Sequence, residues 1–501
     1  MQRKSVLSIM SGWLVLVAFL LCSACGNRTS AIALQHAPFK ISVMLPTYAN
    51  HPLPDDTSPV LEKLEEYTNS DVELVWVPYS TYKDKTKITL SSLKLPTVIV
   101  IPDKSPEFIS AARRGVFWEL GPYLAEFPNL SQANEAVLSN TSIDGKVYAI
   151  YRARDLGRYG VTIRKDWLQH VGLEQPRTLD EFYEVLRAFT FDDPDRDGRE
   201  DTYGLVATYY PSTFDVIQTW FGAPNRWGVD ETGNLVPAHL TKEYKDGLRF
   251  LKKLYDEGLM NPGFAVMDPK FWLEPLIHGE AGVLVDVADQ AQRAAHEIRK
   301  AYGLEDVIDV FSGVEGPQGM KLPSTSGYDG MLAVSKSAVK NEQELRHVLS
   351  FLDKLNDEQM QILLYNGMEG RHYRKSPESM KTDFSYEIDS LKQMLMFIPG
   401  PRHLISADSP IRRKVKEVIK ANESLLLNNP AEEFISDTYM KKGLLLDTIV
   451  SDARTQYIIG QIDEKGWEEA VRRWRQEGGD EYIREMNEQW QRARSPSTGT
   501  E

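Results

Sequence analysis

Short apolar runs alternate with helically spaced segments along residues 39–101. Brief runs of apolar residues bounded by turn residues favour buried strands, and apolar residues that recur every third or fourth position favour helices. On these criteria strands are predicted at 39–46, 72–77 and 96–101, and a helix at 57–69. Because strands that alternate with helices predict an open, mostly parallel sheet, the first lobe is expected to be α/β.

The rest of the chain carries more helical periodicity. Helices are predicted at 165–171, 179–189, 243–258 and 341–355. A second, helix-rich lobe is therefore expected, and 501 residues are enough to bury two cores. The predicted division assigns 39–152 and 287–332 to the first lobe, 153–286 and 333–494 to the second, and 495–501 to a frayed tail.

The N-terminus has the layout of a secretory signal. Arg3 and Lys4 precede an apolar stretch at 6–21, and this charged-then-apolar order is typical of a segment that is removed on export. We therefore expect residues 1–24 to be a signal peptide. The alternative is a signal anchor that stays uncleaved.

A cysteine directly follows this segment. The order of residues 21–26 resembles a bacterial lipobox, in which small residues precede a cysteine that becomes acylated, although Cys22 stands where leucine is usual. Cys25 is the expected lipid carrier, and residues 25–38 form a polar tether. Both cysteines would then be used up, so no disulfide is expected within the chain.

The chain is acidic, with 58 Lys and Arg against 72 Asp and Glu and a formal net charge of −14 at pH 7. Such a balance excludes nucleic acid as a partner and discourages broad docking on anionic lipid. Membrane attachment would therefore depend on the acyl chains at Cys25. The expected location is the extracellular face of the cell membrane, and the expected state is a monomer.

A compact acidic motif begins at residue 193. Acids stand at positions 1, 3, 5 and 9 of a calcium loop and glycine stands at position 6: Asp193, Asp195, Asp197, Asp201 and Gly198. Alternate carboxylates can turn inward on one hard cation, while position 7, here Arg199, would contribute its backbone carbonyl. Position 12 is Gly204, so the bidentate glutamate of a complete EF-hand is missing. Structural Ca²⁺ is the favoured interpretation, and a solvated acidic turn is the alternative.

Several further segments resemble the extracellular solute-binding lipoproteins that serve carbohydrate ABC transporters in Gram-positive bacteria. The resemblance covers nearly the whole mature chain in order, at residues 144–150, 163–168, 178–182, 271–283, 366–373 and 459–479. Among these segments, 144–150 is similar to the first crossing between lobes in that family, and 271–283 is similar to the return crossing.

The resemblance implies a two-lobed fold of the periplasmic-binding-protein type II kind, with a hinge and an interlobe cleft that closes on a sugar. It implies an oligosaccharide cargo, including uronate-containing ones, that is delivered to ABC permease subunits. It also implies that the calcium loop is a structural feature of the fold, with Thr202 as a sixth ligand beside the five positions above.

Sugar recognition uses aromatic rings against pyranose faces, and charged or amide groups on the hydroxyls. Tyr48 follows the first strand, where the carboxyl end of an open sheet faces a ligand. Trp220 and Trp227 cluster in a loop-like stretch, and Tyr328 lies between glycines at an expected later crossing. Arg152 could clamp a carboxylated sugar. The alternative for each aromatic ring is the core, and for Arg152 it is an ion pair across the lobe boundary.

Catalytic templates are absent from the sequence, which has no zincin histidine pair, no Gly-x-Ser-x-Gly elbow and no phosphate loop. We therefore expect a binding protein and not an enzyme. An exported, lipid-anchored glycosidase stays an alternative, because such an enzyme needs only two carboxylates. A sugar-sensing lipoprotein that serves a receptor kinase is another, because capture for transport and capture for sensing use the same site.

Overall fold

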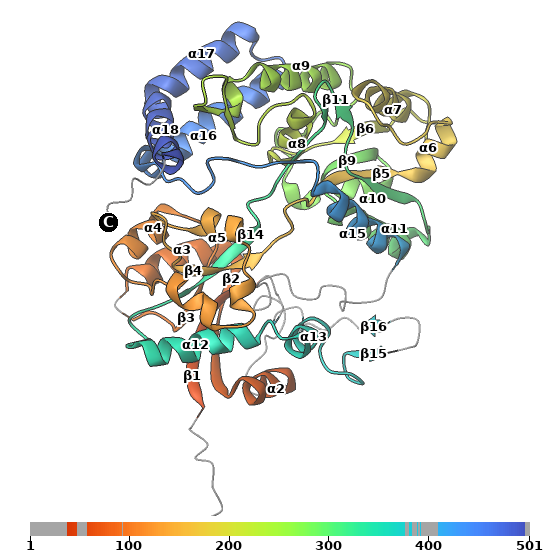
Figure 1. Ribbon diagram of the computed structural model, residues 1–501. Coiled ribbons are helices and arrows are strands. Elements are labelled where there is room, and N and C mark those ends of the chain that lie inside the picture. The colour runs from red at the N-terminus through yellow and green to blue at the C-terminus, as the bar shows by residue number, and fades with distance from the viewer. Residues whose placement is uncertain are drawn as a thin grey trace, which may run out of the picture. The chain divides into compact units, whose positions relative to one another are not determined.

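The computed structural model describes residues 38–47, 58–92, 94–375, 380–382, 388, 391 and 409–495. These residues build two main sheets, each with its own helices (Figure 1). No helix in the described part of the chain combines the length and the apolar character that a membrane crossing requires.

The first sheet has five strands in the order β2-β1-β3-β14-β4. Its strands are β1 (Phe39–Thr47), β2 (Ser70–Pro78), β3 (Val98–Ile101), β4 (Ala149–Ala153) and β14 (Tyr328–Val334). All residues of β3 and β4 are buried, as expected for strands covered on both faces. The strands predicted at 39–46, 72–77 and 96–101 are confirmed as β1, β2 and β3.

Strand β14 comes from late in the chain and lies between β3 and β4. It pairs antiparallel with both, with Met331 opposite Ile101 on one side and Tyr151 on the other. Because β1 and β3 run parallel, the sheet is mixed. The prediction of a mostly parallel sheet did not foresee this antiparallel insertion, which depends on contacts between segments far apart in the sequence.

Six helices of the described chain accompany this sheet: α2 (Pro59–Thr68), α3 (Tyr79–Leu90), α4 (Pro106–Arg113), α5 (Glu135–Thr141), α12 (Glu342–Lys354) and α13 (Glu358–Asn366). Helix α2 starts where Ser58 accepts a hydrogen bond from the Leu61 amide at 3.1 Å, followed by proline at the first helical position. Helices α12 and α13 pack against α2. Figure 1 shows β14 and α12, both teal, among red and orange elements from the start of the chain.

The second sheet has four strands in the order β10-β5-β9-β6. Its strands are β5 (Tyr159–Arg164), β6 (Tyr203–Val206), β9 (Ala281–Val287) and β10 (Ile308–Phe311). Strands β6 and β9 run parallel, whereas β5 is antiparallel to both β9 and β10. The carboxyl ends of β6 and β9 therefore meet the start of β5 at one edge of the sheet.

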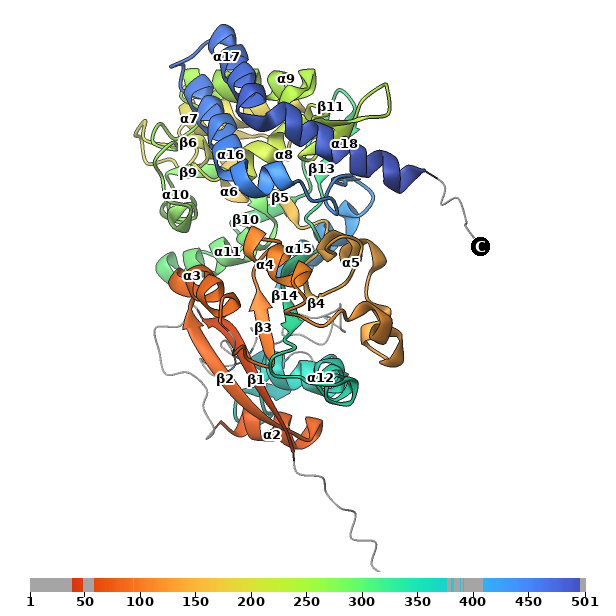
Figure 2. The same ribbon diagram turned by 90° about the vertical axis from the view of Figure 1, so that its left-hand side faces the viewer.

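This sheet carries more helices than the first, which confirms the helix-rich character predicted for it. They are α6 (Lys165–Val171), α7 (Leu179–Phe191), α8 (Ser212–Trp220), α9 (Lys242–Asp256), α10 (Glu274–His278), α11 (Asp289–Tyr302), α15 (Pro410–Asn422), α16 (Asp437–Ile458), α17 (Glu464–Trp474) and α18 (Asp480–Arg494). Figure 2 shows the blue helices α16, α17 and α18 together near the green α9, and α16 contacts all three others.

Short elements connect these helices and strands. The two-stranded ladders are β7 (Trp227–Val229) with β8 (Leu235–Pro237), β11 (Glu315–Gly316) with β12 (Gly319–Met320), β13 (Leu322–Pro323) with β17 (Leu426–Leu427), and β15 (Tyr373–Lys375) with β16 (Met380–Thr382). Four short 3-10 helices are described, η1 (Gly121–Glu126), η2 (Leu130–Gln132), η3 (Ala238–Leu240) and η4 (Pro269–Phe271). A short π-helix, η7 (Arg475–Gly479), precedes α18.

The strand pairing departs from the predicted lobe boundaries. Residues 287–332 were assigned to the first lobe, but β10 pairs with β5 of the second sheet and only β14 joins the first. Residues 333–494 were assigned to the second lobe, yet α12 and α13 pack on α2. The return crossing expected at 271–283 contains the start of β9, a central strand, and the chain instead returns between β10 and β14.

Candidate functional site

The edge of the second sheet where β6 and β9 end is built by the start of α8. The Thr213 hydroxyl donates to the Val285 carbonyl at 2.9 Å, and the Ser212 hydroxyl donates to Asp286 Oδ1 at 2.7 Å. These two bonds place the first turn of α8 over the end of β9. Ligands of open α/β sheets bind outside the carboxyl ends of the strands, so this edge is a candidate site.

Exposed aromatic side chains gather at this edge. Tyr209 and Tyr210 follow β6 and are 51% and 49% exposed. The Tyr210 ring meets Trp272 edge to face, with 6.2 Å between ring centroids, and Phe271 beside Trp272 is exposed as well. We call Tyr209, Tyr210, Phe271 and Trp272 the aromatic edge. Neighbouring exposed rings mark interaction sites, because their burial would be favourable.

Carboxylates flank the aromatic edge. Burial raises the pKa of Asp286, while the Ser212 hydroxyl and the Val287 amide, which donates at 2.7 Å, oppose the rise. Burial also raises the pKa of Asp215, which Arg454 opposes from 3.6 Å. Asp286 is buried, so the part-exposed carboxylate of Asp215 is the acceptor open to a ligand hydroxyl group.

The corresponding edge of the first sheet lies where β14 begins. Tyr328 stands opposite Ala153, the last residue of β4. Arg154 follows β4 and pairs with Asp329 at 2.6 Å. Burial raises the pKa of Tyr328, with a further rise from the charges of Glu432 and Asp103.

Hydrogen bonds from Lys104 and Ser139 hold the loop that carries Glu432 beside the first sheet. Lys104, just after β3, donates to the carbonyls of Asn140, Glu432 and Glu433 at 3.0, 3.3 and 3.1 Å. Burial lowers the pKa of this ammonium group to about 8, against the opposite influence of Glu432 and Glu433. The Ser139 hydroxyl also donates to the Glu433 carboxylate.

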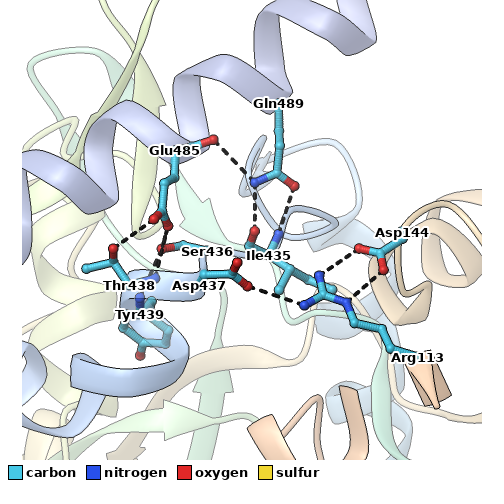
Figure 3. Close-up of polar contacts among 9 residues, drawn as sticks. All are labelled: Arg113, Asp144, Ile435, Ser436, Asp437, Thr438, Tyr439, Glu485 and Gln489. Carbon is cyan, nitrogen blue, oxygen red and sulfur yellow. Dashed lines mark hydrogen bonds and ion pairs between the residues drawn. The ribbon is translucent and has the colours of Figure 1, made fainter. Parts of the chain in front are cut away.

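Helix α16 begins directly after this loop and is held by α18 (Figure 3). Glu485 accepts hydrogen bonds from the Ser436 hydroxyl and from the amide and hydroxyl of Thr438, the last two at 3.0 and 2.8 Å. Gln489 donates to the Ile435 carbonyl at 2.7 Å and accepts from its amide at 3.2 Å. Both side chains from α18 therefore satisfy groups that the helix start would otherwise leave open.

The start of α16 is also tied to α4. Arg113 forks onto Asp144 at 2.8 and 2.9 Å, and its remaining nitrogen reaches Asp437 at 3.3 Å (Figure 3). The first turn of α16 is thereby fixed from two directions. That turn carries Tyr439, whose ring stacks on Tyr482 with 4.8 Å between centroids.

Two of the predicted sugar contacts lie in the core. Trp220 is fully buried and meets Phe182 edge to face at 5.1 Å, and Trp227 is 5% exposed and meets Tyr482 at 5.0 Å. These positions contradict the prediction that the two indole rings are open to a ligand. The physical reason is that α8 turns Trp220 toward α7, and β7 turns Trp227 toward α18, so both rings fill apolar space between elements.

The remaining predicted contacts have mixed positions. Tyr328 is half-buried at the edge described above, which agrees with its predicted place but does not test its role. Arg152 is buried in β4, with a guanidinium nitrogen 3.4 Å from where a side chain on Gly330 would begin. Its neighbour Arg154 pairs with Asp329 of β14, a strand of the same sheet, so this ion pair does not cross the lobe boundary. Tyr48, like Cys25, lies outside the described residues.

The acidic motif forms a loop between α7 and β6. Ligand oxygens of Asp193, Asp195 and Asp197 lie within 4.8 Å of one another, the spacing of a shared cation. Burial raises the pKa of Asp195, and the charges of Asp197 and Asp193 add to the rise. The backbone reaches this arrangement through positive φ angles at Asp193, Arg196 and Gly198.

The side chains that follow in this loop have contacts of their own. The Arg199 side chain is 74% exposed and lies 3.5 Å from Asp197 and 4.0 Å from Asp201, so it partly neutralises the acids. Thr202 is buried and its hydroxyl donates to the Phe189 carbonyl at 2.9 Å, which contradicts its prediction as a metal ligand. Gly204 explains the missing glutamate, because a side chain there would begin 2.7 Å from the Leu186 backbone.

Comparisons with known proteins agree with this arrangement. Residues 53–362 match the family described as bacterial extracellular solute-binding protein. The lipoprotein LipO of Bacillus subtilis (strain 168) is 45% identical over 96% of this chain and 98% of its own length. The chain belongs to the bacterial extracellular solute-binding protein family.

Two further relatives extend the comparison. The polygalacturonan/rhamnogalacturonan-binding protein YtcQ of Bacillus subtilis (strain 168) is 34% identical over 91% of this chain and 92% of its own. A solved structure of the Streptococcus pneumoniae ABC-transporter substrate-binding protein FusA, an EF-hand mutant in complex with fructo-nystose, superposes with a TM-score of 0.65 at 18% identity, covering 91% of this chain and 99% of that one. The chain therefore has the two-lobed α/β fold of solute-binding proteins, as predicted.

Sequence reasoning missed the aromatic edge of this solute-binding protein. Tyr210 follows a strand at its carboxyl end, which is the argument that selected Tyr48, so the same signal could have found it. Trp272 carries no such signal, because the turn that brings it beside Tyr210 is distant in sequence.

We predict that Trp220→Ala lowers the free energy of unfolding by about 3–5 kcal/mol, because it removes a fully buried ring from the second sheet's core. Urea denaturation measures this change. Phe271→Ala is the control, because that ring is 48% exposed and its loss should leave stability nearly unchanged. An unchanged unfolding midpoint for Trp220→Ala would return this residue to the candidate ligand contacts.

Proposed function

We propose that this protein captures a carbohydrate outside the cell, as a monomer, and delivers it to the permease of an ABC transporter. The observation that carries the proposal is the aromatic edge, where exposed rings lie near the part-exposed carboxylate of Asp215 in the first turn of α8. Rings offer flat apolar faces to pyranoses, and carboxylates accept from hydroxyl groups. The relative YtcQ is named for binding polygalacturonan and rhamnogalacturonan, and FusA is named as the substrate-binding protein of a fructooligosaccharide ABC transporter.

Binding would bring the two lobes together on the ligand. The second lobe supplies the aromatic edge, and the first supplies Tyr328 and the ion pair of Arg154 with Asp329. A ligand that touches both lobes stabilises a closed arrangement over an open one, since only the closed one makes both sets of contacts. We propose binding without turnover, so the sugar leaves the protein chemically unchanged.

Tyr210→Ala should weaken oligosaccharide binding about tenfold, because it removes a ring that stacks on sugar. Isothermal titration against a panel of neutral and uronic oligosaccharides measures it. Tyr302→Ala is the matched control, because this tyrosine is 54% exposed at the far end of α11, about 20 Å along the helix from Asp289.

Two results would contradict the proposed function. One is the absence of heat from every oligosaccharide of the panel. The other is recovery of a shortened oligosaccharide after long incubation, which would favour the glycosidase alternative.

We further propose that the loop at 193–201 holds a structural Ca²⁺. The three converging carboxylates support this, and so does the mention of an EF-hand in the structure of FusA. Asp193, Asp195 and Asp197 would supply carboxylate oxygens, and the metal would hold α7 and β6 at a fixed separation. Asp201 and the Arg199 carbonyl are the proposed further ligands.

Removal of calcium with a chelator should lower the melting temperature, and Ca²⁺ should restore it better than Mg²⁺, because Ca²⁺ tolerates an incomplete oxygen shell. Differential scanning calorimetry measures the shift. Asp195→Ala should abolish the response, because alanine offers no ligand oxygen. Asp230→Ala is the control, because Asp230 also accepts backbone hydrogen bonds in an exposed turn but lies outside the acidic cluster. A melting temperature that does not change on addition of the chelator would contradict the calcium site and favour a solvated acidic turn.

We propose that Cys25 carries the lipid that holds the protein at the outer face of the membrane. The support is the lipobox-like order before Cys25 and the relative named as a lipoprotein. Serine lacks the thiol that lipid transfer modifies, so Cys25→Ser should release the protein into the medium, whereas Cys22→Ser should leave it cell-bound. Immunoblots of cells and medium measure the partition, and equal release of both variants would refute the assignment.

A further inference from the structure

Arg226 is held in an unusual backbone conformation. Its φ is +64°, a region that residues other than glycine rarely adopt. Such strain costs about 1–3 kcal/mol and persists where the surroundings enforce it, commonly at functional sites. Here the Ala238 amide donates to the Arg226 carbonyl at 2.7 Å, and the preceding Asn225 donates to the carbonyls of Ser324 and Leu427 at 2.9 Å each.

The two segments that hold the loop of Asn225 and Arg226 both lead toward residues of the candidate site. Ser324 lies four residues before Tyr328, on the return from β10 to β14, and Leu427 lies before the loop that carries Glu432. The side chain of Arg226 is therefore presented from a loop anchored on two other segments. The backbone from which the Arg226 side chain extends is therefore held in place, which favours the defined geometry of a bidentate contact.

Arg226 is exposed, and no described residue forms an ion pair or side-chain hydrogen bond with its guanidinium. Its neighbours differ. Arg154 pairs with Asp329 at 2.6 Å, Arg158 pairs with Asp289 at 2.6 Å, and Arg454 pairs with Asp215 at 3.6 Å. In a chain with 72 acidic residues, an arginine without a carboxylate partner beside a candidate site is unexpected.

The positive charge of Arg226 acts on residues at the edges of both sheets. Desolvation by the surrounding chain lowers its pKa, but the charges of Glu432 and Asp215 raise the pKa overall, so the guanidinium stays protonated. Its positive charge in turn opposes the rise in the pKa of Tyr328 and of Tyr210. A permanent cation thus lies within electrostatic reach of rings on both edges, with its donors free for a ligand.

We propose that Arg226 binds a carboxylate of the ligand and that the captured carbohydrate is therefore an acidic saccharide, a hexuronate-containing oligosaccharide. This rests on the proposed function, because it assigns the ligand class of the same site. The planar guanidinium fork would meet the carboxylate with two parallel N–H···O bonds, while the aromatic edge receives the sugar ring. Arg154, Arg158 and Arg454 would each have to break an ion pair to bind the ligand, whereas Arg226 would not.

The test uses the full chain in detergent and two matched probes, trigalacturonate and its fully methyl-esterified form. The ester keeps every ring and hydroxyl but has no negative charge. We expect the wild-type protein to bind the acid more tightly. Arg226→Gln should weaken binding of the acid about 10- to 100-fold and binding of the ester by less than about threefold. Arg226→Lys should lie between, because it keeps the charge but loses the fork.

Arg484→Gln on α18 is the control, because Arg484 is an exposed arginine that pairs with Glu481 and Glu488 of its own helix, and this variant should bind both probes as wild type does. Melting curves accompany each titration, and Arg226→Lys carries the test if Arg226→Gln does not fold. Equal weakening of acid and ester, or no weakening of either, would overturn the assignment. Wild-type binding of neutral oligosaccharides but not of trigalacturonate would overturn it and leave the proposed function standing, whereas binding of no saccharide would overturn both.

Discussion

The insertion of β14 between β3 and β4 is the constraint on which the rest of this structure depends. A strand inside a sheet pairs on both sides, so this late segment must return to the first sheet after β10 has completed the second. The return forces the chain to connect the two sheets again, and it places Tyr328 beside the ends of β3 and β4. The site residues of the first lobe are therefore a consequence of topology and not of any local motif.

The second lobe reaches its binding chemistry through paired charges. Its acids and arginines neutralise one another in ion pairs such as Arg158 with Asp289, which stabilises buried charge at the sheet edge. The start of α16 is fixed in the same manner, between Glu485 of α18 and Arg113 of α4. Against this background Arg226 stands apart, because no described residue forms an ion pair or side-chain hydrogen bond with its guanidinium.

The acidic loop at 193–201 shows how packing limits a local motif. The carboxylates of Asp193, Asp195 and Asp197 converge as their spacing requires, since they depend only on nearby backbone. The twelfth position cannot follow the EF-hand pattern, because β6 lies so close to α7 that Gly204 leaves no room for a side chain. Thr202 is likewise directed at the Phe189 carbonyl. The packing of β6 against α7 therefore sets the residue type at position 204 and the orientation of the Thr202 side chain.

The sequence by itself determined what depends on neighbouring residues: the helices and strands, whose periodicity reports one buried face, and the converging carboxylates of the acidic loop. It also determined the family, through motifs spread along the chain. Only the tertiary structure decided which aromatic residues are open, because Trp220 and Tyr210 differ in burial through contacts with distant elements and not through their flanking residues. The lobe boundaries were misplaced for the same reason, since the pairing of β10 with β5 joins segments that local periodicity cannot relate.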